Sequence, residues 1–309
     1  MNTPRGPDYE ANSKAGLVEN PEDVALENHM ISTMPHRRPF TFKNAQRRKP
    51  QAPPENTSGR YDAPPDPVID IPGLAKGSAL SFDSDIARRL MRRDVHPKEA
   101  FTARGDGGAF WRVSVKELGP GGGTGVPYER MTASPEARLE ITLACAVLGR
   151  QRMLFVTQKA TELGVARIVP LITEHSVPPK DFSHEKAHAW PGQIVRAAKQ
   201  CRRGSLPELL APVPLALFVE SPVMAQADEC LVLDNIGGPS SAIEGNPGKV
   251  VLLIGPEGGF SDAERTLLDG KAKTWTLGGR VLRAETAVLV GLSAMQLFWG
   301  DYRAPEAIS

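Results

Sequence analysis

Apolar runs and helical repeats alternate along the chain from about residue 133 onward. The segment 152–164, for example, repeats apolar residues at helical spacing and ends in Gly164, a residue suited to a helix C-terminus. Continuously apolar strands that alternate with helices predict a parallel sheet covered on both faces. The predicted strands are 139–147, 165–172, 230–234, 250–254 and 274–277, and the predicted helices are 152–164, 189–201, 261–268 and 284–300.

The preceding segment, 68–132, has shorter runs that Gly, Pro and Asp separate. Such runs predict a small β-barrel or sandwich. Between two of them, 84–93 (SDIARRLMRR) predicts a short basic helix capped by Ser84. A contact with RNA and a solvated face fit its basic residues equally well; these are Arg88, Arg89, Arg92 and Arg93. The glycine-rich stretch 120–125 is expected to form a flexible linker or a hairpin loop.

Residues 1–67 differ in composition, because they hold 11 of the 28 prolines and few branched aliphatic residues. So little apolar surface cannot offset the entropy of ordering, and we expect a mostly disordered extension. Within it, 37–49 carries six basic residues and no acid. This tract is either an RNA-contacting arm or a solvated tail.

Overall composition narrows the class of protein. The chain has 309 residues, 24% of them charged, and a net charge of +1, which fits about two globular domains and carries no signal for nucleic acid. It has no apolar run long enough for a membrane span and no secretory signal pattern. Three well-separated cysteines indicate free thiols in a reducing compartment. We therefore expect a cytoplasmic protein that does not span a membrane.

Two glycine-rich loops follow predicted strands. The first, IGPEGGF (254–260), leads into a helix whose Ser261 and Glu264 match a capping box. Ligands of open α/β sheets bind beyond the carboxyl ends of strands, and glycines let the backbone approach a ligand closely. Glu257 is either a hydrogen-bonded turn acid or a group that accepts a proton.

The second loop, LGGRVLRAETAV (277–288), has the same layout and carries Arg283 and Glu285 at the entry of the last helix. Glu285 alone would fit simple compensation of the helix dipole. Two such loops in one sheet, both charged, predict a binding pocket that they share.

Other charged residues also fit interpretations that involve no binding site. Lys159 and Glu162 fit a surface ion pair, and the basic cluster Lys199, Arg202 and Arg203 fits either compensation of a helix dipole or contact with RNA phosphates. His175 is isolated, so a structural or surface role is expected and no metal site is predicted. The GxSxG, Walker A, HExxH and GxGxxG motifs do not occur, which argues against a dinucleotide-binding dehydrogenase.

Four collinear motifs carry a family resemblance: RMLFVTQKATELGVARIVPLITEHSV, AAKQCRRGSLPEL, LLIGPEGGFSDAE and LGGRVLRAETAV. Together they resemble the RsmE family of 16S ribosomal RNA uridine-N3 methyltransferases, which belongs to the SPOUT class. The resemblance is strong over 134–303 and weak over the segment before it. It implies an α/β domain with a C-terminal trefoil knot, preceded by a PUA-like barrel that binds RNA, and a domain division at 1–67, 68–133 and 134–305.

The resemblance also implies a function: S-adenosylmethionine-dependent methylation of N3 of a uridine in 16S rRNA of the 30S subunit, by a homodimer without a metal. The implied catalytic residues are Arg283, Glu257 and Glu285. The implied cofactor contacts are Ile254, Gly255, Pro256, Glu257, Gly258, Leu277, Gly278, Val281 and Leu282. The implied RNA contacts are Arg88, Arg89, Arg92, Lys159, Gln200 and Arg203.

Some positions depart from the family pattern. The usual RTETA is 283–287 (RAETA) here, Lys199 stands where an acid is common, and Arg89-Leu90 replaces a His-Leu pair. These departures concern the barrel and the choice of target, not the cofactor pocket. Two alternatives remain open: a non-catalytic ribosome-assembly factor that binds RNA, and a SPOUT methyltransferase with another RNA target.

Overall fold

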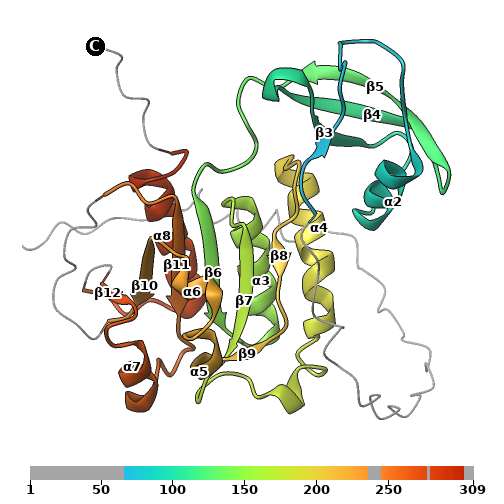
Figure 1. Cartoon of the computed structure of the whole chain (residues 1–309). Coiled ribbons are helices and arrows are strands. Elements are labelled where there is room, and N and C mark those ends of the chain that lie inside the picture. The colour runs from blue at the N-terminus through green and yellow to red at the C-terminus, as the bar shows by residue number, and fades with distance from the viewer. Residues whose placement is uncertain (1–65, 236–244, 277–278, 303–309) are drawn as a thin grey trace, which may run out of the picture. The chain divides into compact units, whose positions relative to one another are not determined.

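The structure is a computed structural model that describes residues 66–235, 245–276 and 279–302. The predicted basic tract 37–49 lies outside the described residues, as do the predicted cofactor contacts Leu277 and Gly278. Figure 1 shows two sheets. The first group of elements is β1 (Ile69–Asp70), β2 (Leu80–Phe82), α2 (Ser84–Arg92), β3 (Ala100–Arg104), β4 (Phe110–Gly119) and β5 (Gly122–Arg130).

The second group forms the α/β part of the chain. In order, it comprises β6 (Glu140–Ala146), α3 (Arg150–Glu162), β7 (Arg167–Ile172), α4 (Trp190–Cys201), β8 (Glu208–Leu209), β9 (Val213–Pro214), α5 (Leu215–Phe218), α6 (Pro222–Ala225), β10 (Glu229–Leu233), β11 (Lys249–Ile254), α7 (Asp262–Leu268), β12 (Lys273–Trp275) and α8 (Ala284–Phe298). Single 3₁₀ turns lie at 106–108, 179–181 and 187–189.

The larger sheet has the strand order β12-β10-β11-β6-β7-β8, with β9 also paired to β7, and every pair is parallel. Its central strands are apolar on both faces, because alternate side chains enter two different cores. On β6, Leu143 and Cys145 join one core and Ala144 joins the other. The predicted parallel sheet with buried faces is therefore confirmed.

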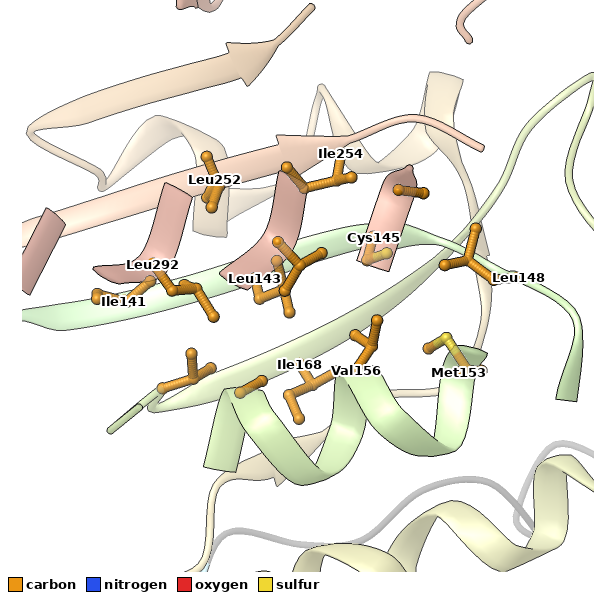
Figure 2. Packing of buried hydrophobic residues seen from close by; sticks show 14 of the residues in the cluster. Ile141, Leu143, Cys145, Leu148, Met153, Val156, Ile168, Leu252, Ile254 and Leu292 are labelled. Carbon is orange, nitrogen blue, oxygen red and sulfur yellow. The ribbon is translucent and has the colours of Figure 1, made fainter. Parts of the chain in front are cut away.

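Three long helices cover one face of this sheet and three short helices cover the other. The first core contains side chains of α3, α4 and α8, and the second contains side chains of α5, α6 and α7. Figure 2 shows Leu143 and Leu252 of the sheet in one cluster with Leu292 of α8 and Val156 of α3. All four side chains are fully buried, so each contributes on the order of 1.5–3 kcal/mol of hydrophobic stabilisation.

The smaller sheet has the order β1-β3-β4-β5-β2 and its own apolar core. One detail of the sequence interpretation was wrong, and one pair of alternatives is decided. The cap of α2 is Asp83 rather than Ser84, because the Asp83 carboxylate accepts hydrogen bonds from the backbone N–H groups of Asp85 and Ile86. The stretch 120–125 is no flexible linker: β4 and β5 form a hairpin around 120–121, and the predicted hairpin loop is confirmed.

Packing explains why this hairpin is rich in glycine. A Cβ on Gly123 would lie 2.4 Å from the Phe82 ring and 2.5 Å from the Glu117 carbonyl oxygen, which is closer than real contacts allow. Strand β5 can pair with β2 and β4 only because this position has no side chain.

Within the described part of the chain, no helix combines the length and apolarity that a membrane crossing would need.

Hydrogen bonds join the end of α2 and a residue of β3, which belong to the first group of elements, to the loop after α4. The Arg93 guanidinium at the end of α2 donates to the Asp66 carboxylate and to the Gly204 carbonyl, both at 2.5 Å. The Thr102 hydroxyl on β3 donates to the Arg202 carbonyl at 2.8 Å. Burial raises the pKa of Asp66, but the hydrogen bonds and charges of Arg93 and Arg89 outweigh it, so the pKa of Asp66 lies below its ordinary value.

Candidate functional site

A cavity of about 340 Å³ lies at the carboxyl ends of β10, β11 and β12. Its size falls in the range of small-molecule sites. The cavity is where the sequence placed a pocket, because the two glycine-rich loops both contribute to its wall. The lining comprises Leu233, Asp234, Asn235, residues 254–260, Arg265, Trp275, Thr276, residues 280–282, Ala284 and Ala287.

The first loop is held in a compact turn. Gly259 has a φ of +70°, which favours glycine, and its N–H donates to the Pro256 carbonyl at 2.9 Å. The helix that follows has the predicted capping box: the Ser261 side chain accepts from the Glu264 N–H, and the Glu264 carboxylate accepts from the Ser261 N–H at 2.9 Å. The cap fixes where α7 begins and therefore the shape of the turn before it.

His175, from the loop after β7, packs against this turn. Its Nδ1 lies 3.2 Å from the Gly259 carbonyl oxygen. A Cβ on Gly258 would lie 3.0 Å from the His175 Cβ and Cγ, so only glycine fits here without displacing the histidine. The structural role expected for His175 agrees with this contact. No group of three or more His, Cys, Asp or Glu side chains in the described residues is arranged to hold a metal ion.

The second loop supplies the opposite wall. Arg280, Val281 and Leu282 line the cavity, and α8 begins immediately after them with Arg283 at the N-cap position. Arg265 of α7 forms an ion pair with Asp234, and both side chains line the cavity as well. The cavity thus combines apolar walls, exposed backbone and a few charged groups.

Arg152 links the two loops through their carboxylates. It lies in the first turn of α3, where its Nη1 donates to Glu257 Oε1 and its Nε lies 3.8 Å from Glu285 Oε1. Cys145 lies nearby at the end of β6. Burial raises the pKa of its thiol, and the charges of Glu257 and Glu285 raise it further, so the thiol stays protonated and is no candidate nucleophile.

The comparisons with known proteins agree with this geometry. An RNA methyltransferase domain family matches residues 135–296. The ribosomal RNA small subunit methyltransferase E of Synechocystis is 31% identical over 211 residues, which cover 67% of this chain and 68% of the relative. The chain belongs to the RsmE family.

Two solved structures support the fold of this RsmE chain. A methyltransferase from Legionella pneumophila, in complex with S-adenosylmethionine, is 32% identical with a TM-score of 0.56 and covers 76% of this chain and 99% of its own. The RsmE of Neisseria gonorrhoeae, bound to S-adenosylmethionine, is 28% identical with a TM-score of 0.57 and covers 76% and 98%. The chain therefore contains an RNA methyltransferase domain, and both of these similar structures hold S-adenosylmethionine.

The structure brings most of the predicted cofactor contacts of the RsmE chain together. The described ones all line the cavity: Ile254, Gly255, Pro256, Glu257, Gly258, Val281 and Leu282. Of the predicted catalytic residues, only Glu257 is part of the lining. Arg283 is exposed at the start of α8, and the half-buried Glu285 is directed toward Arg152, so both flank the cavity.

The predicted RNA contacts divide by exposure. Arg88, Arg92 and Gln200 are exposed on their helices. Arg89 pairs with Asp66 at 2.9 Å, and Lys159 pairs with Glu162 at 2.7 Å. Arg203 is buried: its guanidinium pairs with Glu136 and donates to the carbonyls of Thr161 and Val165. A guanidinium in these contacts holds the protein together and is not presented at the surface.

Sequence reasoning missed Arg152, Asp234 and Arg265. Asp234 directly follows β10, so its position at the carboxyl end of a parallel strand could have indicated that it lies in a binding site. Arg152 gave no such signal, because its loop partners come from positions 105 and 133 residues further along the chain. Only the parallel order β11-β6 brings the start of α3 next to them.

Proposed function

We propose that the protein transfers the methyl group of S-adenosylmethionine to N3 of a uridine in 16S rRNA of the small ribosomal subunit. The observation that carries this proposal is the cavity between the two glycine-rich loops, in a chain whose relatives are named ribosomal RNA small subunit methyltransferases. An uncharged uridine N3 is a poor nucleophile, so the enzyme must favour loss of its proton and orient the nitrogen toward the methyl carbon.

The residues present fit the cofactor. Apolar side chains of Ile254, Val281, Leu282 and Trp275 can hold an adenine ring, and the turn at Gly255 and Gly258 exposes backbone groups for polar contacts. A side chain at Gly258 would require His175 to shift, because its Cβ would lie only 3.0 Å from the His175 Cβ. When bound, S-adenosylmethionine would supply an electrophilic methyl carbon on sulfur, and the C–S bonding electrons would leave with the sulfur as the N3–C bond forms.

The protein's own groups manage charge and protons. Arg283, exposed beside the cavity, would stabilise negative charge that develops on the uracil oxygens. A carboxylate, Glu257 or Glu285, would accept the N3 proton directly or through a water molecule. Orientation of the base can supply a large share of the barrier reduction, on the order of 7–11 kcal/mol. The base would leave its stack to reach this position.

We also propose the finer architecture that the family resemblance implies. Residues 68–133 would form a PUA-like RNA-binding barrel, 134–305 would form a SPOUT domain with a trefoil knot, and 1–67 would be an extension. The exposed Arg88 and Arg92 on α2 and Gln200 on α4 would contact RNA, and Arg89 and Lys159 would need to leave their ion pairs to do so.

A homodimer is supported by exposed apolar side chains on two helices that pack against each other. Phe155 of α3 is 39% exposed, and Leu297 and Phe298 of α8 are both 55% exposed. Exposed apolar side chains of this size are typical of an interface. We propose that α3 and α8 form the dimer contact.

Methylation of purified small subunits tests the proposed function. The wild type should transfer a labelled methyl group to 16S rRNA, and Arg283→Ala should lose most turnover while it keeps cofactor binding. If the protein does not bind S-adenosylmethionine in a titration and does not methylate any RNA, it would instead be a non-catalytic assembly factor. Mass mapping of rRNA from a deletion strain identifies the base and separates this target from another RNA.

A further inference from the structure

Three charged side chains from different parts of the chain meet beside the cavity. Arg152 belongs to α3, Glu257 to the turn after β11, and Glu285 to the first turn of α8. The guanidinium contacts both carboxylates, with a direct hydrogen bond from Nη1 to Glu257 and a separation of 3.8 Å from Nε to Glu285 Oε1. No other described basic side chain forms an ion pair with either carboxylate.

We propose that Arg152 is a positioning residue of the active site, which fixes the Glu257 carboxylate at the cavity wall and ties it to Glu285. The inference rests on the proposed function. It also narrows that function, because it separates the roles of the two acids. Glu257 lines the cavity and Glu285 does not, so Glu257 is the acid that faces the reacting groups and accepts the N3 proton.

Glu285 differs from Glu257 in its surroundings. Its side chain is only 16% exposed, against 40% for Glu257. Its Oε2 is buried and has no hydrogen-bond partner among the described residues. A buried carboxylate oxygen without a hydrogen bond is costly, and the nearby guanidinium, which pairs with Oε1, compensates for part of this cost. Glu285 therefore holds the Arg152 guanidinium in place through their ion pair.

Electrostatics give Arg152 a second task. The Arg152 guanidinium contacts both carboxylates, so their charges lie near each other. Two carboxylates so close repel each other, and a cation between them relieves the repulsion. Without Arg152, Glu257 would lose this ion pair, and its side chain, which is 40% exposed, would turn away from Glu285 into solvent.

The turnover of variants tests the positioning role. Arg152→Gln should lower kcat about 10- to 100-fold, the effect expected when a general base loses its orientation. It should leave the Kd for S-adenosylmethionine within about threefold, because the rest of the cavity is unchanged. Arg152→Lys should recover part of the turnover. Arg138→Gln is the matched control, since Arg138 is 91% exposed and far from the cavity in its contacts.

A double variant distinguishes positioning from an independent effect. If Arg152 acts through Glu257, then Arg152→Gln combined with Glu257→Gln should be no slower than Glu257→Gln alone. A double variant that multiplies the two losses would overturn the proposal, and so would an unchanged kcat in Arg152→Gln.

Hydrogen exchange tests the same contact without turnover. Arg152→Gln should speed the exchange of backbone amides in 255–260, whereas Arg138→Gln should not, and equal protection in both would overturn the proposal. The two failures are distinct. A wild type that methylates no RNA refutes the proposed function, while unchanged exchange in 255–260 refutes the role of Arg152 whatever the reaction is.

Discussion

The replacement of Arg203 by Ala separates two readings of a basic residue. The sequence motif that contains it is compatible with RNA contact, whereas the structure buries its guanidinium, whose side chain is 6% exposed. The guanidinium lies 3.2 Å from a Glu136 carboxylate oxygen and donates to the carbonyls of Thr161 at 3.1 Å and Val165 at 2.9 Å. It therefore joins the end of α3 to the loop after α4.

The expected loss of stability follows from these contacts. Arg203→Ala removes the donor to the Thr161 and Val165 carbonyls and the cation paired with Glu136, whose carboxylate still accepts from the Gly204 and Ser205 N–H groups and the Ser205 hydroxyl. Removal of one partner of a buried ion pair typically costs about 3–5 kcal/mol, and the remaining donors of Glu136 place the expected cost at the lower end, about 3 kcal/mol. Arg202→Ala is the matched control: Arg202 is 55% exposed and pairs with an exposed Glu129, so its loss should cost less than about 1 kcal/mol.

Chemical denaturation of both variants measures the difference. Arg203→Ala should lower the free energy of unfolding by at least about 2 kcal/mol more than Arg202→Ala, with an unchanged dependence on denaturant. The affinity of folded Arg203→Ala for 16S rRNA should stay within about threefold of wild type. A variant that keeps its full stability and loses RNA affinity would refute the structural role and restore the interpretation as an RNA contact.

Three further predictions follow from the described contacts. Gly258→Val should raise the Kd for S-adenosylmethionine by about 10- to 100-fold, as measured by titration, because overpacking against His175 costs about 1–3 kcal/mol; unchanged affinity would place the cofactor elsewhere. Burial raises the pKa of Asp66, but the hydrogen bonds and charges of Arg93 and Arg89 lower it more, so the net pKa lies below its ordinary value. The stability that Asp66 contributes is therefore present above about pH 4 and is lost as pH falls through the lowered pKa. Acid denaturation of Asp66→Asn should lack this pH-dependent loss of stability. Phe298→Asp should convert a dimer to monomers in sedimentation, and a dimer that persists would move the interface away from α8.

The fold was largely predictable because its core is simple. The central strands β6, β7, β10 and β11 are apolar over most of their length. The helices between them repeat apolar residues at helical spacing, so the period separates the two. The short elements β8, β9, α5 and α6 were missed. They have two to four residues each, too few for any period to appear.

Caps show where local sequence decides and where it does not. At Ser261, the pattern Ser-x-x-Glu is specific for a capping box, and the structure has one. At the start of α2, Asp83 and Ser84 are both good capping residues, and the sequence does not rank them. The backbone decides: Asp83 is extended, with a ψ of −179°, and its carboxylate reaches the free N–H groups.

The candidate site divides in the same way. Its backbone could be predicted, because two glycine-rich loops at strand ends must meet in a parallel sheet. Its side chains could not, because a long basic side chain is equally suited to a surface, an ion pair or a buried network. Arg203 belongs to a conspicuous basic motif, yet the structure buries it. Arg152 lies at a helix start that the sequence analysis did not single out, yet it contacts Glu257 and Glu285.

The position of the two arginines follows from the order of the strands. Because β11 pairs with β6, the helix that leaves β6 begins beside the turn that leaves β11, and Arg152 in its first turn meets Glu257 there. Arg203 lies at the opposite end of α3, where that helix ends near Thr161 and Val165. A cation at the helix start therefore lies beside the cavity at the carboxyl edge of the sheet and pairs with Glu257. A cation near the helix end satisfies carbonyl groups that the helix leaves free.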